Sequence, residues 1–301
     1  MLCSFSRTFP RNVEKFLRNE SRLRRRFREE TVTDLLVGGI LGIGASNLIV
    51  DFPDEVKTGA DMEWVFYDAA TNSFFRIFIQ AKRSFGRGKQ WKRHSVRELF
   101  HRTKSTKKLQ SDVLINCVKK YGTSSYPLYF IYNSGTTCTL ARNDKVQNIE
   151  GVNVVDGYFI NNRVKHAAHH PKPSSIKSLK ELHRQFMPLS ALLCLGNNRR
   201  GIIGRPMNLG SRSEEMIARL MIASSIPTPE DVLSTVREFR LNTIESMAKL
   251  GFDKDEVERW IPMPKLSQQV PAYIQRLMDG EPVGEKDAGI SLIFISDSSF
   301  R

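Results

Sequence analysis

The chain has 301 residues, enough to bury a substantial core, and its 40% apolar and 26% charged content is ordinary for a folded globular protein rather than a disordered or fibrous one. Its 46 lysines and arginines outnumber 32 acids, which gives a formal charge of +14. This surplus favours polyanionic partners, because each neutralised phosphate releases condensed counterions, but charge alone does not separate DNA from RNA or an anionic membrane.

The sequence predicts a cytoplasmic protein that does not enter a membrane. The N-terminus lacks the apolar core of a signal peptide. The most apolar run, Leu35 to Val50, is shorter than the ~20 residues that cross a bilayer, and glycines interrupt it. No two cysteines form a CxxC pair, so we expect reduced, buried thiols at Cys3, Cys117, Cys138 and Cys194.

The first sixty residues predict two helices and a loop. Residues 10–30 have a basic helical pattern, and residues 29–41 continue with apolar side chains at helical spacing. Glycines then end the helix. Pro53 and Asp54 lie in the loop that follows, where they do not form a catalytic pair.

Residues 61–67 and 74–82 predict a β-hairpin, because the residues between them favour a turn. Alternation along the strands places Asp61 and Glu63 on one face of the first strand, and Gln80 and Lys82 on one face of the second. The opposite faces are entirely apolar, so we expect that side to be core.

The rest of the chain predicts further helices and strands around this hairpin. A basic stretch at 83–108 precedes a helix at 109–118 and a buried strand at 127–133. Short strands are expected within 138–160 and a loop at 166–177. The remaining pattern predicts helices, and finally a strand at 289–296; the helical ranges are 178–195, 212–223, 228–250, 253–260 and 268–279.

The polar residues of the hairpin suit phosphodiester hydrolysis. That reaction needs a hard divalent cation, an activated water and stabilisation of charge on the phosphate. Mg²⁺ prefers oxygen ligands and keeps several waters, so one or two carboxylates and a carbonyl suffice. Asp61 followed by Gln80-Ala81-Lys82, on the polar sides of two apolar strands, presents such a set.

These residues resemble the PD-(D/E)XK, or restriction-endonuclease-like, nuclease superfamily. The motifs run from Glu29-Glu30 in a helix, through Gly59-Ala60-Asp61, to Ile79-Gln80-Ala81-Lys82. A later helix with Gln110 and the strand PLYFIYN follow in the expected order. The resemblance covers about residues 25–133, and it is closest to an uncharacterised bacterial family related to restriction enzymes and anti-phage effector nucleases.

The resemblance implies a role for each matching residue. Asp61 would be the main Mg²⁺ ligand, with Mn²⁺ able to substitute, and the Ala81 carbonyl a further ligand. Gln80 stands where most relatives have Glu, and would ligate the metal or position water. Lys82 would activate the water, and either Glu29 or Glu30 would be the acid of the first helix. Gln110 would face the site and contact the nucleic acid, unless it is an ordinary surface residue.

Two further expectations come from the residues themselves. Glu63, two residues from Asp61 on the same face, would restore the charge that Gln80 lacks, unless it only faces solvent at a strand edge. The one-sided charge after Lys82 predicts a DNA-binding surface that includes Arg83, Lys89, Lys92, Arg93 and Arg97.

We therefore expect an α/β fold with a restriction-endonuclease-like mixed sheet, a central hairpin flanked by helices and a helical C-terminal elaboration. Residues 1–165 would form the nuclease core, and the last strand of 166–301 would rejoin the core sheet. The expected function is Mg²⁺-dependent cleavage of DNA, in defence or DNA processing. The alternatives are a non-catalytic nucleic-acid-binding module and an RNA-directed nuclease. The C-terminal helices would form the interface of a homo-oligomer or bind a regulatory partner.

Overall fold

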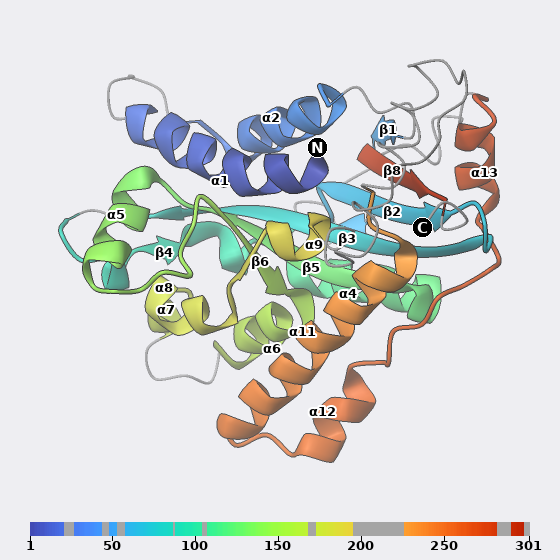
Figure 1. Cartoon of the computed structure of the whole chain (residues 1–301). Helices are drawn as coiled ribbons and strands as arrows, with labels where there is room; N and C mark the ends of the chain where they lie inside the picture. Colours follow the sequence, from blue (N-terminus) through green and yellow to red (C-terminus); the bar gives the residue numbers. More distant parts are fainter. Residues whose placement is uncertain are drawn as a thin grey trace, which may run out of the picture.

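The computed structural model places most of the chain in one mixed sheet with helices on both faces (Figure 1). It describes residues 1–20, 27–43, 48–52, 58–86, 88–103, 107–167, 173–194, 226–281 and 290–297. The loop residues Pro53 and Asp54, which were not expected to form a catalytic pair, and the helix expected at 212–223 lie outside these residues.

The helices begin with α1 and α2, which precede the sheet, and most of the later ones follow its individual strands. The α-helices are α1 (Leu2–Asn19), α2 (Glu29–Leu41), α4 (Gln110–Tyr121), α5 (Gly135–Asn143), α6 (Gly157–Ala167), α7 (Pro173–Ile176), α8 (Leu179–Leu182), α9 (Ser190–Leu193), α11 (Pro229–Lys249), α12 (Lys254–Trp260) and α13 (Ala272–Met278). Short 3-10 turns are η2 (Trp91–Arg93), η3 (Arg97–Phe100), η4 (Gly122–Ser124) and η5 (His183–Gln185).

The eight-stranded sheet has the order β1-β8-β2-β3-β5-β6-β7, and β4 pairs with β3. Its strands are β1 (Leu48–Phe52), β2 (Met62–Asp68), β3 (Ser73–Phe85), β4 (Ser95–Val96), β5 (Ser125–Tyr132), β6 (Val152–Asp156), β7 (Met187–Pro188) and β8 (Ile290–Ser296). The expected hairpin is confirmed as the antiparallel pair β2–β3, with Met62 opposite Ile79. β8 lies between β1 and β2, parallel to β2, so the final strand joins the same sheet.

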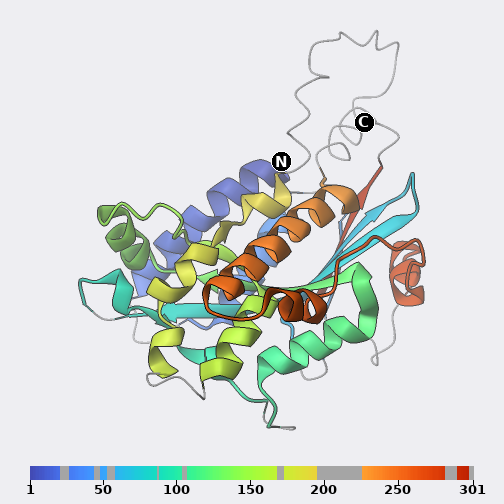
Figure 2. The ribbon, with the colours of Figure 1, turned by 90° about the horizontal axis from the view of Figure 1, so that it is seen from below.

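Each face of the sheet contacts its own group of helices. The apolar face of the hairpin, with Trp64 and Ile77, packs in one cluster with residues of α1, α2, α9 and α11. The other face, with Phe78 and Tyr129, packs against α4, α5, α6 and α8. Figure 2, seen from below, shows α11 and α4 running across the molecule. The side expected to be polar is therefore covered as well, which the strand pattern did not indicate.

Several expectations are corrected by the fold. The helix expected at 178–195 is divided into α8, η5, strand β7 and α9, and the loop expected at 166–177 contains α7. Residues 135–143 form helix α5 instead of a strand, and the Ser134 side chain caps it by accepting a hydrogen bond from Thr137 N. Cys3 and Cys194 form a disulfide rather than remaining reduced, because α1 packs against α9 although 191 residues separate the two cysteines. The other two, Cys117 and Cys138, are buried free thiols as expected. Within the described ranges, no helix has the length and hydropathy of a membrane span.

Candidate active site at the start of the central hairpin

Asp61 lies where the chain enters strand β2. Its backbone N–H donates to the carbonyl of Ile79 at 2.8 Å, which extends the hairpin by one residue. Gly59, two residues earlier, has φ +67°, and a Cβ at that position would lie 2.9 Å from Leu114 N on helix α4. Only glycine fits this close approach comfortably, so the turn seats Asp61 between β3 and the first turns of α4.

Asp61 and the backbone of Ala81 direct oxygen atoms at one point. Asp61 Oδ2 accepts hydrogen bonds from Gln80 Nε2 at 2.5 Å and from Ala81 N at 2.6 Å. The same Gln80 Nε2 donates to the Ala81 carbonyl at 3.2 Å. A carboxylate oxygen and a carbonyl oxygen therefore converge on a single centre of positive partial charge, which is the arrangement that a small cation would also satisfy.

The other end of the Gln80 amide has no hydrogen-bond partner in the part of the chain that the structure describes. The Gln80 side chain is fully buried, and its Oε1 accepts no hydrogen bond from any residue that the structure describes. A buried acceptor without a donor costs about 1–3 kcal/mol. This acceptor, beside the partly buried carboxylate of Asp61, is open to a water molecule or a ligand.

Lys82 follows two residues later, on the same face of β3 as Gln80. Only 4% of Lys82 is exposed, and its Nζ lies 3.9 Å from Glu29 Oε1 at the first residue of α2. Glu30, in contrast, is exposed to solvent and lies 3.8 Å from Arg28. The sequence left the choice between the two acids open, and the structure places Glu29 at the site.

Two buried tyrosines of β5 lie beside this group, and sequence reasoning did not single them out. Burial raises the pKa of Tyr129 far above its ordinary value, and the charges of Asp61 and Asp112 raise it further. Burial likewise raises the pKa of Tyr132, whose hydroxyl lies 3.0 Å from Thr33 Oγ1 on α2. Tyr129 pairs with Gln80 across β3 and β5 and packs on the same face of the sheet as Phe78, whereas Tyr132 packs on the opposite face with residues of α2. The sequence offered only the strand PLYFIYN, in which a spacing of three residues turns the two rings to opposite faces.

Glu63 does not join this group. Its Oε1 accepts from Tyr273 at 2.7 Å and lies 3.5 Å from Arg76 Nη1, and its Oε2 accepts from Ser291 at 2.8 Å. These partners come from α13, β3 and β8, and they occupy both carboxylate oxygens. The expectation that Glu63 supplies charge to the metal is corrected accordingly, and we leave it out of the proposed site.

The basic stretch divides into buried and exposed residues. Arg83 is buried, and its guanidinium donates to both carboxylate oxygens of Glu20 and to the Phe27 carbonyl, so we remove it from the proposed DNA-binding surface. Gln110 is buried at the start of α4. The other four predicted contacts are exposed on η2, η3 and the turn before them, namely Lys89, Lys92, Arg93 and Arg97. Of these, Lys92 lies 3.5 Å from Asp144.

The oxygens at the site come from one carboxylate, one side-chain amide and one carbonyl. Across the described part of the chain, no three His, Cys, Asp or Glu side chains gather as a metal-binding group. Any cation at Asp61 would therefore be held with little negative charge from the protein.

Comparison with known proteins places the chain in a family. The model of "Family of unknown function (DUF6615)" matches residues 2–301, nearly the whole length. The chain belongs to this family. A search of the curated proteins found no match. The description of this family names no activity.

Proposed function

We propose that this protein is a Mg²⁺-dependent deoxyribonuclease with a PD-(D/E)XK-type site at Asp61, Gln80 and Lys82. One observation supports it most: Asp61 Oδ2 and the Ala81 carbonyl converge on the amide of Gln80, whose buried Oε1 has no hydrogen-bond donor among the described residues. The buried Lys82, two residues further along β3 on the same face as Gln80, would supply a positive charge to this group.

The residues at this point fit a small, hard cation. All of the candidate donor atoms are oxygens, which Mg²⁺ prefers, and rotation of the Gln80 amide would turn Oε1 toward the point that Nε2 now occupies. When bound, Mg²⁺ would polarise the phosphate and lower the pKa of a water molecule. The ligands would be Asp61, Gln80 and the Ala81 carbonyl.

The protein's own side chains would orient the reactants. The Lys82 ammonium, held by Glu29 at 3.9 Å, would attract the phosphate and position a water beside it. Tyr129, which pairs with Gln80 across β3 and β5, would exclude bulk water from the inner side, because its ring is buried and neutral. The exposed bases of η2 and η3 would hold the DNA backbone without reading its sequence.

The test is cleavage of supercoiled plasmid DNA by the purified chain in Mg²⁺, Mn²⁺ or EDTA. We expect nicking with Mg²⁺ or Mn²⁺ and none in EDTA. Asp61→Asn and Lys82→Met should each abolish nicking, whereas the exposed matched variants Asp279→Asn and Lys15→Met should retain it. Full activity of a folded Asp61→Asn protein would rule out the assignment.

The hydrogen bond between Gln80 and Asp61 also favours a second candidate function. It satisfies Asp61 Oδ2 without any cation, as a nucleic-acid-binding module with no turnover would require. Metal-independent binding of DNA without cleavage would support that alternative. A matched RNA substrate in the same assay separates a ribonuclease from a deoxyribonuclease.

A further inference from the structure

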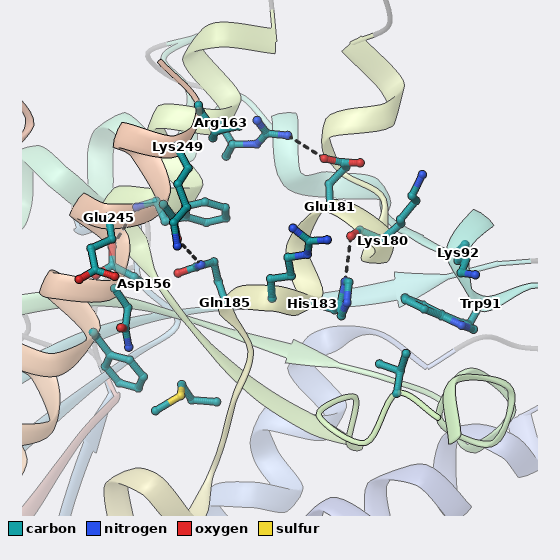
Figure 3. Close-up of a pocket in the computed structure, with 18 residues that line it drawn as sticks. Trp91, Lys92, Asp156, Arg163, Lys180, Glu181, His183, Gln185, Glu245 and Lys249 are labelled. Atoms are coloured by element: carbon teal, nitrogen blue, oxygen red, sulfur yellow. Dashed lines mark hydrogen bonds and ion pairs between the residues drawn. The ribbon is translucent and has the colours of Figure 1, made fainter. Parts of the chain in front are cut away.

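A second concave site lies at the β6–β7 end of the sheet, and Asp61 is not among its lining residues. It is a cavity of about 790 Å³ between α6, the α8–η5 segment and α11, and η2 closes one end (Figure 3). None of the residues assigned above to metal binding or catalysis lines it. The volume is within the range of about 300–1,000 Å³ that is typical of small-molecule sites.

The lining of this cavity carries excess positive charge. Five basic side chains line it, against the three acids Asp156, Glu181 and Glu245. Two of the bases already lie near acids: Lys92 Nζ is 3.5 Å from Asp144, and Arg163 Nη2 is 3.5 Å from Glu181. The other three have no ion pair within the described residues, and they are Lys180, Arg184 and Lys249.

These basic residues converge from separate elements. Figure 3 shows Arg163 of α6 and Lys249 of α11 on one side of the cavity, with Lys180 of α8 across from them. Arg163 is largely buried, and its Nε has no hydrogen-bond partner in the described parts of the chain. Bases drawn to one concavity from three helices differ from a solvated stripe along a single helix.

The acids of the cavity do not cancel this charge. Asp156 Oδ2 accepts from the Tyr126 hydroxyl at 2.5 Å, and its Oδ1 accepts from Phe159 N at 2.9 Å. Both carboxylate oxygens of Asp156 therefore accept hydrogen bonds from protein groups, and the Glu181 carboxylate lies beside the Arg163 guanidinium. Glu245 alone is left to oppose the three bases without ion-pair partners.

We propose that this cavity binds a small molecule that carries two or more phosphate groups. Lysine and arginine are the usual protein donors to phosphate, and three unmatched cations suit a ligand with several negative charges. The amide and hydroxyl groups of Gln185, Asn242 and Ser246 line the same space and can bind the uncharged part of such a ligand. The proposal does not depend on nuclease activity.

The test is isothermal titration calorimetry of the full chain with ATP, pyrophosphate and inorganic phosphate. EDTA is present throughout, so that metal at Asp61 does not contribute. We expect ATP and pyrophosphate to bind more tightly than phosphate. Lys180→Glu/Lys249→Glu should weaken ATP binding by at least about tenfold, equivalent to one lost charge-assisted contact. The charge-matched control Lys15→Glu/Lys254→Glu changes exposed lysines outside the cavity and should bind like the parent chain.

Three outcomes would overturn the proposal. The first is no binding of ATP or pyrophosphate at millimolar concentration. The second is an equal loss in the pocket variant and the matched control, which would assign binding to the overall charge. The third is pocket-dependent binding of a twelve-nucleotide DNA strand but of neither small phosphate. Circular dichroism checks folding, and the single exposed variant Arg184→Glu replaces the double variant if that does not fold.

Discussion

Gln80→Glu offers the sharpest test of the cation site, because it places a second carboxylate against Asp61. Gln80 Nε2 now lies 2.5 Å from Asp61 Oδ2, and a glutamate would lose that hydrogen bond. Two like charges relaxed to about 4 Å repel by about 4 kcal/mol at an effective dielectric constant of about 20. Proton uptake limits this cost, since each pKa unit is worth about 1.4 kcal/mol. We therefore expect Gln80→Glu to lose about 3–4 kcal/mol of unfolding free energy in EDTA.

The assay is thermal unfolding at pH 7.5, with EDTA and with increasing Mg²⁺. A loss of 3–4 kcal/mol corresponds to a melting temperature lower by about 6–16 °C for a domain of this size. Mg²⁺ at a concentration one hundred times its Kd should raise the free energy of unfolding of Gln80→Glu by about 2.7 kcal/mol. The exchange variant Asp61→Asn/Gln80→Glu keeps one amide and one carboxylate, so it should be stable in EDTA. If Gln80→Glu alone is equally stable in EDTA and in Mg²⁺, no cation binds between these residues.

Three further predictions concern other parts of the molecule. Changing the exposed Arg93 and Arg97 to Glu should flatten the slope of log DNA affinity against log salt concentration by about 0.9 for each lost phosphate contact. Filter binding at several salt concentrations measures this slope, and an unchanged slope would mean that both arginines only face solvent. Arg76→Met leaves the buried Glu63 carboxylate without its cation, and should lower the free energy of urea unfolding by about 3–5 kcal/mol; a loss below 1 kcal/mol would contradict this role. Burial raises the pKa of Asp156 from 3.8 to about 6, so this carboxyl binds a proton more tightly in the folded protein than in the unfolded chain. Proton binding at Asp156 therefore adds about 3 kcal/mol to the free energy of unfolding below pH 4, and this stabilisation is lost as the pH rises to about 6. Asp156→Asn should remove that part of the pH dependence in paired urea titrations, and identical pH profiles would refute it.

The sequence by itself determined the elements that depend on local pattern. Alternation of apolar and polar residues predicted both strands of the hairpin and the apolar face that packs on α1 and α2, because a strand turns each side chain by about 180° from the last. The turn residues between the strands determined the hairpin connection. The pairing of Asp61 with Gln80 follows from that register, so the centre of the site was within reach of the sequence.

Only the tertiary structure decided which distant groups meet this centre. Glu29 rather than Glu30 faces Lys82, because the packing of α2 sets the rotation of the helix about its axis. The carboxylate of Glu63 is held by Tyr273 and Ser291, which lie more than two hundred residues further along the chain. The burial of Arg83 and the disulfide between Cys3 and Cys194 likewise depend on contacts between elements far apart in sequence. The same is true of the basic cavity. Periodicity reports the face on which a side chain lies, whereas its partner is set by which other element covers that face.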